Sequence, residues 1–247
     1  MSTFETSAMR KAAVNWVDGM KLSEHHFNLM QDHVYDLHRD ALSHVVTPLR
    51  YGLLPPTFDW SKSLDFSIRI DQGKIIQIQV IQCRAITSSG MRIEILRNGA
   101  ESLYAAGDIL QAEFPAPDDV SETFYSVVIG VNPYARKPIG EPDPEESPAR
   151  IPYAIPQYKI ELIPGKQISQ WKGSSHFIEI ARLLVDQKEI TLDNSFIPPC
   201  FSVQNHPDLH ASYLELGNTM GELGSLATAI VQKVRSEKTK TSLENIS

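Results

Sequence analysis

The segment that decides how the fold begins is Trp16-Val17-Asp18-Gly19-Met20-Lys21-Leu22-Ser23-Glu24-His25-His26-Phe27. It joins a compact turn to a long helix. Ser23 is a candidate N-cap, and Glu24 falls in the first helical turn, where a carboxylate interacts favourably with the helix dipole. The helix should end before Pro48, because the residue that precedes a proline is disfavoured in the helical region. Apolar residues recur at steps of three and four, the spacing of one helix face: Phe27, Met30, Val34, Leu37, Ala41 and Val45.

Three residues of this segment have predicted structural roles. We expect Trp16 to pack as a core plug over the base of the helix rather than to serve as a ligand platform, since tryptophan buries a large area where a helix meets a sheet. Gly19 is expected to need a positive φ angle or a close approach of the backbone. His26 is expected to hydrogen-bond the backbone of the turn. Residues 1–47 therefore form the lead-in, the turn and the first helix.

Residues 48–205 show the pattern of an antiparallel β-sandwich, so the predicted fold class is mainly β with flanking helices. Short segments alternate apolar and polar residues and are separated by turn sequences. No helical segment alternates with them, which argues against a parallel sheet. We expect seven or eight strands, among them residues 66–70, 76–82, 91–95, 124–131, 158–163, 177–185 and 189–192.

The stretch 132–156 interrupts this pattern with seven prolines and four acidic residues. A loop of this length without secondary structure is unusual inside a compact domain. Its composition favours a solvated, mobile loop. The alternative is an arm that docks on a neighbouring subunit, where the stiffness of proline lowers the entropy cost of ordering.

A third region, residues 206–236, carries an unbroken heptad seam of apolar side chains that is typical of a coiled coil or a helix bundle. Gly217, Gly221 and Gly224 each weaken such a helix by about 1 kcal/mol relative to alanine, so it should not be stable alone in water. It packs within its own chain or associates with copies of itself, and we favour self-association. Residues 237–247 form a polar tail that is expected to fray. The seam consists of Leu209, Tyr213, Leu216, Met220, Leu223, Ala227, Ile230 and Val234.

Charge and composition argue against several classes of function. The formal charge of −7 and the isoelectric point near 5.6 disfavour a nucleic-acid surface, which needs concentrated lysine and arginine. No stretch approaches the roughly 20 apolar residues of a membrane helix, and no signal-peptide pattern is present, so a cytoplasmic protein is predicted. Cys83 and Cys200 are expected to be reduced thiols, because two cysteines in a chain of this length do not form a disulfide framework.

The sequence predicts neither catalysis, nor a metal site, nor a cofactor. Five histidines lie on or near the first helix, but only His26 and His33 could share a face, two turns apart, which is too far for one ion. No nucleotide-binding, nucleophile-elbow or zinc-protease motif occurs. Ser175 and His176 are neighbours whose side chains would point to opposite faces of a strand, so they do not form a dyad.

Two motifs resemble the TssK family, the baseplate subunit of bacterial type VI secretion systems. The opening segment follows the family pattern W-x-[ED]-G-M-x-L-x-x-x-H-F at Trp16, Asp18, Gly19, Met20, Leu22, His26 and Phe27. Residues 192–200 resemble the run that closes the N-terminal β domain of the family, and they end in Ile197, Pro198, Pro199 and Cys200. Two motifs in the right order, about 170 residues apart, are far more specific than one. The departures are Glu24 and His25, where the family usually has Pro and Gln.

This resemblance implies a structural adaptor rather than an enzyme. It implies a shoulder domain, similar in fold to that of phage receptor-binding proteins, that docks on the TssF–TssG wedge of the baseplate at the inner face of the bacterial inner membrane. It also implies a homotrimer, which the C-terminal helix would join. Family members are longer and end in a head that contacts TssL and TssM of the membrane complex. This chain stops inside the first bundle helix, so we expect a truncated or naturally short relative without that contact.

Two other functions stay open on the residues alone. One is a phage-tail-like receptor-binding or carbohydrate-binding module, for which Trp60 and Trp171 would have to line a groove. The other is a small-molecule enzyme on a β scaffold, which needs polar residues that converge in a pocket. Pro198 and Pro199 are expected to stiffen the exit from the β domain into the last helix.

Overall fold

The computed structural model describes residues 11–56, 62–71, 75–96, 110–116, 122–168, 176–186 and 189–244. Trp60, Trp171 and Ser175, which the sequence singled out, lie outside these residues. The chain divides into two compact units, Met1–Asn205 and His206–Ser247.

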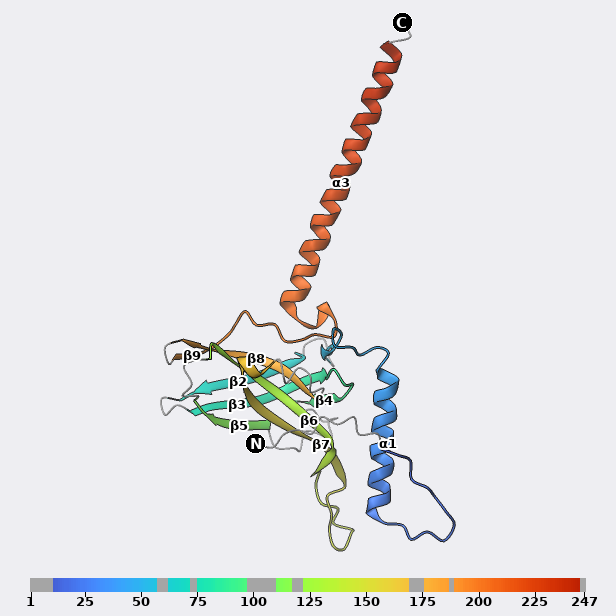
Figure 1. Cartoon of the computed structure of the whole chain (residues 1–247), viewed down its shortest axis with the longest axis vertical. Helices are drawn as coiled ribbons and strands as arrows, with labels where there is room; N and C mark the ends of the chain where they lie inside the picture. The colour runs from blue at the N-terminus through green and yellow to red at the C-terminus, as the bar shows by residue number, and fades with distance from the viewer. Residues whose placement is uncertain are drawn as a thin grey trace. The chain divides into compact units, whose positions relative to one another are not determined.

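The first unit combines one long helix with two antiparallel sheets (Figure 1). The helix is α1 (Glu24–Leu42). One sheet contains β1 (Gly52–Leu53), β2 (Leu64–Ile70), β3 (Ile75–Ile86), β4 (Arg92–Ile95) and β5 (Leu110–Pro115). The other contains β6 (Phe124–Ile139), β7 (Tyr153–Pro164), β8 (Phe177–Asp186) and β9 (Glu189–Leu192). Two 3-10 helices, η1 (Gly165–Gln167) and η2 (Val203–Asn205), complete the described elements of this unit.

The two sheets close on one core, and each is organised around a central strand. β3 pairs with β1 and β2 along one edge and with β4 and β5 along the other, while β6 lies between β7 and β8. Alternation on β3 buries Ile76 and Ile78, as the sequence predicts. These side chains share a hydrophobic cluster with Ile129 of β6 and Ile178 of β8. The prediction of a mainly β fold with flanking helices is therefore confirmed.

The proline-rich stretch is not the structureless loop that its composition predicts. β6 continues to Ile139 and β7 begins at Tyr153, so the two strands pair as a ribbon and leave only residues 140–152 as a loop. We call residues 136–156 the arm. Figure 1 shows this ribbon extending past the end of the sheet. The register pairs Pro138 with Ala154 and Arg136 with Pro156. Prolines are compatible with such a ribbon at positions whose N–H is not needed for the ladder.

A bulge in β6 explains how the ribbon begins. The pairing with β7 jumps from Asn132 to Arg136, which leaves the three intervening residues outside the ladder. Asn132 Oδ1 accepts hydrogen bonds from the backbone N–H groups of Tyr134 and Ala135, at 3.1 and 3.2 Å. Bulges redirect side chains, and this one contains Tyr134 and is followed by Arg136, which both contact α1.

The motif at residues 192–200, which we call the exit motif, is hydrogen-bonded to β1, a strand near the start of the β-rich part of the chain. The N–H of Leu53 donates to the oxygen of Pro199 (2.8 Å), and the N–H of Phe201 donates to the oxygen of Leu53 (3.0 Å). Gly52 permits this approach, because its φ is +117° and an added Cβ would lie 2.0 Å from the Pro199 oxygen. Sequence reasoning missed Gly52, since its role depends on a contact with a segment far away in the chain.

We expect Gly52→Ala to lower the free energy of unfolding by more than about 2 kcal/mol, because the new methyl group would both strain φ and displace Pro199. Urea unfolding monitored by tryptophan fluorescence measures this loss. Gly19→Ala is the matched control: its φ is +75°, but no atom lies within 4 Å of an added Cβ. That variant should lose only about 1 kcal/mol. Equal losses in the two variants would contradict the role assigned to the close approach at Gly52.

The second unit is helix α3 (Pro207–Glu244), which continues beyond residue 236, where the sequence predicted a fraying tail. The apolar side chains of the heptad seam from Tyr213 to Val234 are exposed. An added Cβ at Gly217, Gly221 or Gly224 would meet no atom within 4 Å. Considered by itself, α3 therefore presents an uncovered apolar seam.

Candidate interaction site on the first helix

The turn before α1 is built largely as predicted, except for its tryptophan. The N–H of Met20 donates to the oxygen of Val17 (3.2 Å), and Gly19 has the expected positive φ. Trp16, however, is 48% exposed, and its ring centroid lies 6.3 Å from His26 and 6.4 Å from that of Phe27. The prediction that Trp16 plugs the core is wrong, because these aromatic neighbours are themselves at the surface.

The start of the helix also differs in detail from its prediction. Ser23 occupies the N-cap with an extended backbone, yet its side chain makes no capping hydrogen bond. Its Oγ lies 2.8 Å from Nδ1 of His26 instead. His26 thus contacts the side chain of the cap residue, whereas the sequence predicted a bond to the turn backbone. The helix ends at Leu42, well before Pro48, so Val45 is not part of it.

α1 is oriented with its polar face toward the β unit. Asp32 and Asp36 are its buried residues. The predicted apolar face is exposed: Phe27, Met30, Val34 and Leu37 all remain accessible to solvent. An amphipathic helix normally buries its apolar stripe, so this arrangement is inverted. We call these four residues the α1 apolar surface.

Two polar contacts one helical turn apart attach α1 to β6. Asp36 accepts a hydrogen bond from the Tyr134 hydroxyl, and Asp32 forms an ion pair with Arg136. Four helical residues span about 6 Å and two strand residues about 6.6 Å, so the two spacings match. The helix and the strand run in opposite directions along this contact. The bulge in β6 is what directs Tyr134 toward the helix.

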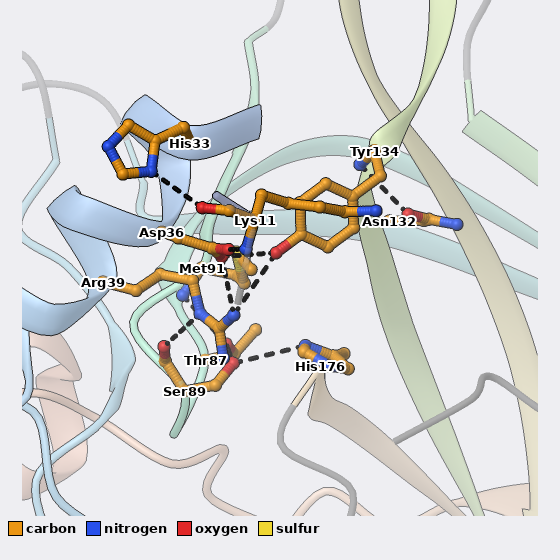
Figure 2. Close-up of polar contacts among 10 residues, drawn as sticks. All are labelled: Lys11, His33, Asp36, Arg39, Thr87, Ser89, Met91, Asn132, Tyr134 and His176. Carbon is orange, nitrogen blue, oxygen red and sulfur yellow. Dashed lines mark hydrogen bonds and ion pairs between the residues drawn. The ribbon is translucent and has the colours of Figure 1, made fainter. Parts of the chain in front are cut away.

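Asp36 is the centre of these contacts (Figure 2). Its Oδ2 accepts the backbone N–H of Lys11 (2.6 Å), while its Oδ1 accepts from Tyr134 and from Arg39 (3.2 Å). His33 Nδ1 lies 2.7 Å from the Lys11 oxygen. A carboxylate that is 7% exposed therefore has donors from three segments, which satisfies the requirement that a buried charge be paired and hydrogen-bonded.

Arg39 extends the network toward the turn between β3 and β4. Its Nε donates to the oxygen of Ser89 (3.2 Å), and Ser89 Oγ lies 3.3 Å from Nδ1 of His176 and 3.1 Å from Thr87 Oγ1. Figure 2 shows Arg39 between Asp36 and Ser89, with His176 on the far side. The network thus joins α1, the β3–β4 turn and the residue before β8.

Burial changes the acidity of two groups in this network. It raises the pKa of Tyr134 to about 12, and the hydrogen bond to Asp36 adds to the rise, so the phenol stays a donor at neutral pH. Burial also lowers the pKa of His176, and the positive charge of Arg39 lowers it further. His176 is therefore neutral at pH 7 in the folded protein.

The depressed pKa of His176 predicts a loss of stability in mild acid. Below the ordinary histidine pKa of 6.5 the unfolded chain takes up a proton that the folded site does not, so the free energy of unfolding falls as the pH drops through 6.5. We expect the urea midpoint to decrease between pH 8 and pH 5.5. His176→Gln should show a smaller decrease, and an identical pH dependence in this variant would contradict the assignment.

The described residues form no candidate metal centre. They contain no group of three or more histidine, cysteine or acidic side chains that could hold a metal ion. Both cysteines are free thiols. Neither described helix has the combination of length and apolar character that crossing a membrane requires. Instead, α1 is attached to the β unit through the polar contacts of Asp32 and Asp36, and its apolar surface faces the solvent. Such a surface suits binding to another protein.

The structure brings the two sequence motifs into different places. The N-terminal motif forms the turn and the start of α1, where Trp16, Leu22 and Phe27 add to the exposed apolar area. The exit motif packs into the β unit: Pro198 is buried, and the Cys200 thiol donates to the Pro198 oxygen (3.2 Å). Sequence reasoning missed Asp32, Asp36, Tyr134 and Arg136, although acidic residues four apart on a helix could have indicated them.

Comparison with known protein families gives a match over part of the chain. A family model described as "Bacterial Type VI secretion, VC_A0110, EvfL, ImpJ, VasE" matches residues 144–246, which include the exit motif and α3 but not the Trp16 turn. No curated protein sequence matches the chain.

Solved structures are similar at low sequence identity. A chain of the TssK-TssF-TssG baseplate subcomplex of the type VI secretion system has a TM-score of 0.53 at 14% identity, over 84% of this chain and 68% of that one. The crystal structure of TssK has a TM-score of 0.49 at 17% identity, over 83% of this chain and 46% of that one. The baseplate complex of the type VI secretion system gives 0.49 at 16%, over 84% and 66%. This chain thus spans less than half of that TssK chain.

The chain is thus similar to a bacterial type VI secretion family over residues 144–246, which include the second of its two motifs. In fold it is similar to a chain of the TssK-TssF-TssG baseplate subcomplex.

Proposed function

We propose that the chain is a structural adaptor of a type VI secretion baseplate that works by binding other proteins rather than by catalysis. It docks on the wedge of TssF and TssG, in the cytoplasm at the inner face of the inner membrane. The proposal is supported by the TssK-like match and by the similarity in fold to a chain of the TssK-TssF-TssG subcomplex. Self-association through the α3 seam, as a homotrimer, is the second element of the proposal.

One observation carries the docking part of the proposal, namely the inverted orientation of α1. Its buried contacts are ionic and hydrogen-bonded, through Asp32 and Asp36, so the attachment of α1 to the β unit does not depend on its apolar side chains. Keeping four large apolar side chains in water has no structural benefit to the isolated unit. Contiguous exposed apolar patches of this kind mark protein-protein contact sites. We therefore assign the α1 apolar surface to the wedge.

The test replaces two of the four residues with small polar ones. We expect Val34→Ser with Leu37→Ser to abolish co-purification with TssF and TssG, while the urea midpoint changes little, because both side chains are already exposed. Gln31→Ser is the control, since it introduces the same residue on α1 without removing apolar area. Undiminished wedge binding by the double variant would show that another surface makes the contact.

A further inference from the structure

A cavity lies at the root of the arm, beside the site already described. Its volume is about 190 Å³, and it is lined by residues of α1, of the β4 region and of both arm strands. A cavity of about 150 Å³ accommodates a benzene ring, whereas sites for drug-sized ligands start at about 300 Å³. The size therefore suits one or two side chains of a protein segment better than a cofactor.

The lining combines rings with positive charge. Tyr35 and Tyr158 contribute aromatic rings, and Pro133 and Pro156 contribute pyrrolidine rings. Grooves lined by aromatic residues bind proline-rich segments, whose stiff backbone loses little entropy on docking. The rings thus select for a proline-containing segment.

The charges around the cavity are unbalanced. Arg84 and Arg92 both contact Oε1 of Glu94, at 3.5 and 2.5 Å, and Arg39 contacts Asp36. Arg84 and Asp36 lie outside the lining itself. Of the lining residues, Arg39 and Arg92 are positive and Glu94 is negative, which leaves one positive charge in excess (2 − 1 = 1). The Arg92 side chain is 55% exposed, so it is available to a further carboxylate. The cavity therefore suits a segment that is acidic as well as rich in proline.

The loop of the arm has this composition. Residues 141–151 contain three prolines and four acidic residues against one arginine. Two acidic side chains are used within the loop, since Glu146 pairs with Arg150 and Asp143 accepts the N–H of Glu145 (2.9 Å). Glu141 and Glu145 are exposed and form no ion pair or side-chain hydrogen bond with the described residues. These two carboxylates are free for a partner.

The loop does not occupy the cavity of its own chain in this structure. Four residue pairs, from Arg136–Pro156 to Ile139–Tyr153, hold the two arm strands together between the cavity and the loop. The ribbon places the loop at least about 10 Å beyond the root, because each strand residue advances about 3.3 Å. The lining of the cavity contains no residue of the loop, so a second molecule is the source of the occupant that we consider.

We propose that the proline-rich acidic loop of one copy, residues 141–151, docks in the root cavity of a second copy, with Glu141 or Glu145 paired to Arg92. Loop and cavity are different surfaces of the same chain, so the contact is heterologous, and repeating it around a rotation axis closes a ring. The arrangement rests on the self-association in the proposed function but adds an interface that α3 does not contain.

Disulfide trapping between two differently sized, tagged copies tests the contact. One copy carries Glu145→Cys and the other Arg92→Cys. Burial raises the pKa of Cys83 to about 12 and that of Cys200 to about 11, so the native thiols react slowly at pH 8. We expect a cross-linked heterodimer from this pair and none when Lys166→Cys, in η1 just after β7, replaces Arg92→Cys. Absence of the heterodimer, or equal cross-linking in the control, would overturn the proposal.

A peptide assay separates this proposal from trimerisation and wedge binding. A fluorescent peptide of residues 140–152 should bind the full chain, and Arg92→Glu should weaken binding at least tenfold. Equal binding of a peptide with the same composition in scrambled order would show that the cavity takes any acidic proline-rich segment and would overturn the assignment to a second copy. If the peptide fails to bind while light scattering still gives a trimer that captures TssF and TssG, the loop contact is wrong and the proposed function stands.

Discussion

Replacing Asp36 with alanine should detach α1 from the β unit. The carboxylate is buried and accepts hydrogen bonds from Tyr134, Arg39 and the backbone of Lys11, so its removal deletes three hydrogen bonds at once. Breaking a buried ionic contact by removing one partner costs about 3–5 kcal/mol. Hydrogen exchange should therefore become more than about 100-fold faster in the amides of α1.

The control for this experiment is Asp40→Ala. Asp40 is an exposed acidic residue of the same helix, one turn after Asp36, and its substitution removes the same group. Equal exchange rates in the two variants would contradict the role of Asp36 as the anchor. Tyr134→Phe in combination with Asp36→Ala should add little, because the two residues make one contact and their effects are not additive.

Much of the fold could be predicted because the spacing of apolar residues along the chain indicates which side chains form the core. Ile76, Ile78 and Val80 alternate with glutamines, and this pattern predicts one buried face of β3 without any knowledge of its partners. β1 and β5 were not predicted. β1 has only two residues, and it forms a strand only through its pairing with β3 and its contact with the exit motif. Such a short strand carries no periodicity of its own.

The candidate site was harder to predict because its contacts override local patterns. The apolar stripe of α1 predicts that this stripe is buried, yet the buried face is the one that carries Asp32 and Asp36. Those contacts depend on where the bulge in β6 places Tyr134 and Arg136, and no local pattern reveals a pairing over about 100 residues. The prolines of the arm likewise predicted a loop, although residues 136–139 pair with residues 153–156 as strands. In both places tertiary contacts decided the outcome.

The exposed seam of α3 leads to the second large expected effect. Substituting Leu216 and Leu223 with aspartate should dissociate the oligomer to monomers in light scattering at micromolar concentration. Both residues lie on the heptad seam, seven positions apart, so two charges would be placed where the helices meet. Burying an unpaired carboxylate costs several kcal/mol at each of the two positions in every copy, and the burial of two leucines is lost as well.

The matched control places the same two charges on the opposite side of the helix. Asn218→Asp and Ser225→Asp are also seven residues apart, and at 100° per residue they lie about 160° from Leu216 and Leu223. This variant should keep the oligomer. If both pairs leave the mass unchanged, the seam does not join copies of the chain. The distinction matters because α3 has glycines at positions 217, 221 and 224 and no described contact along its seam. In the proposed oligomer its 38 residues would gain their stability from association, so the seam, rather than helix propensity, would set the size of the effect.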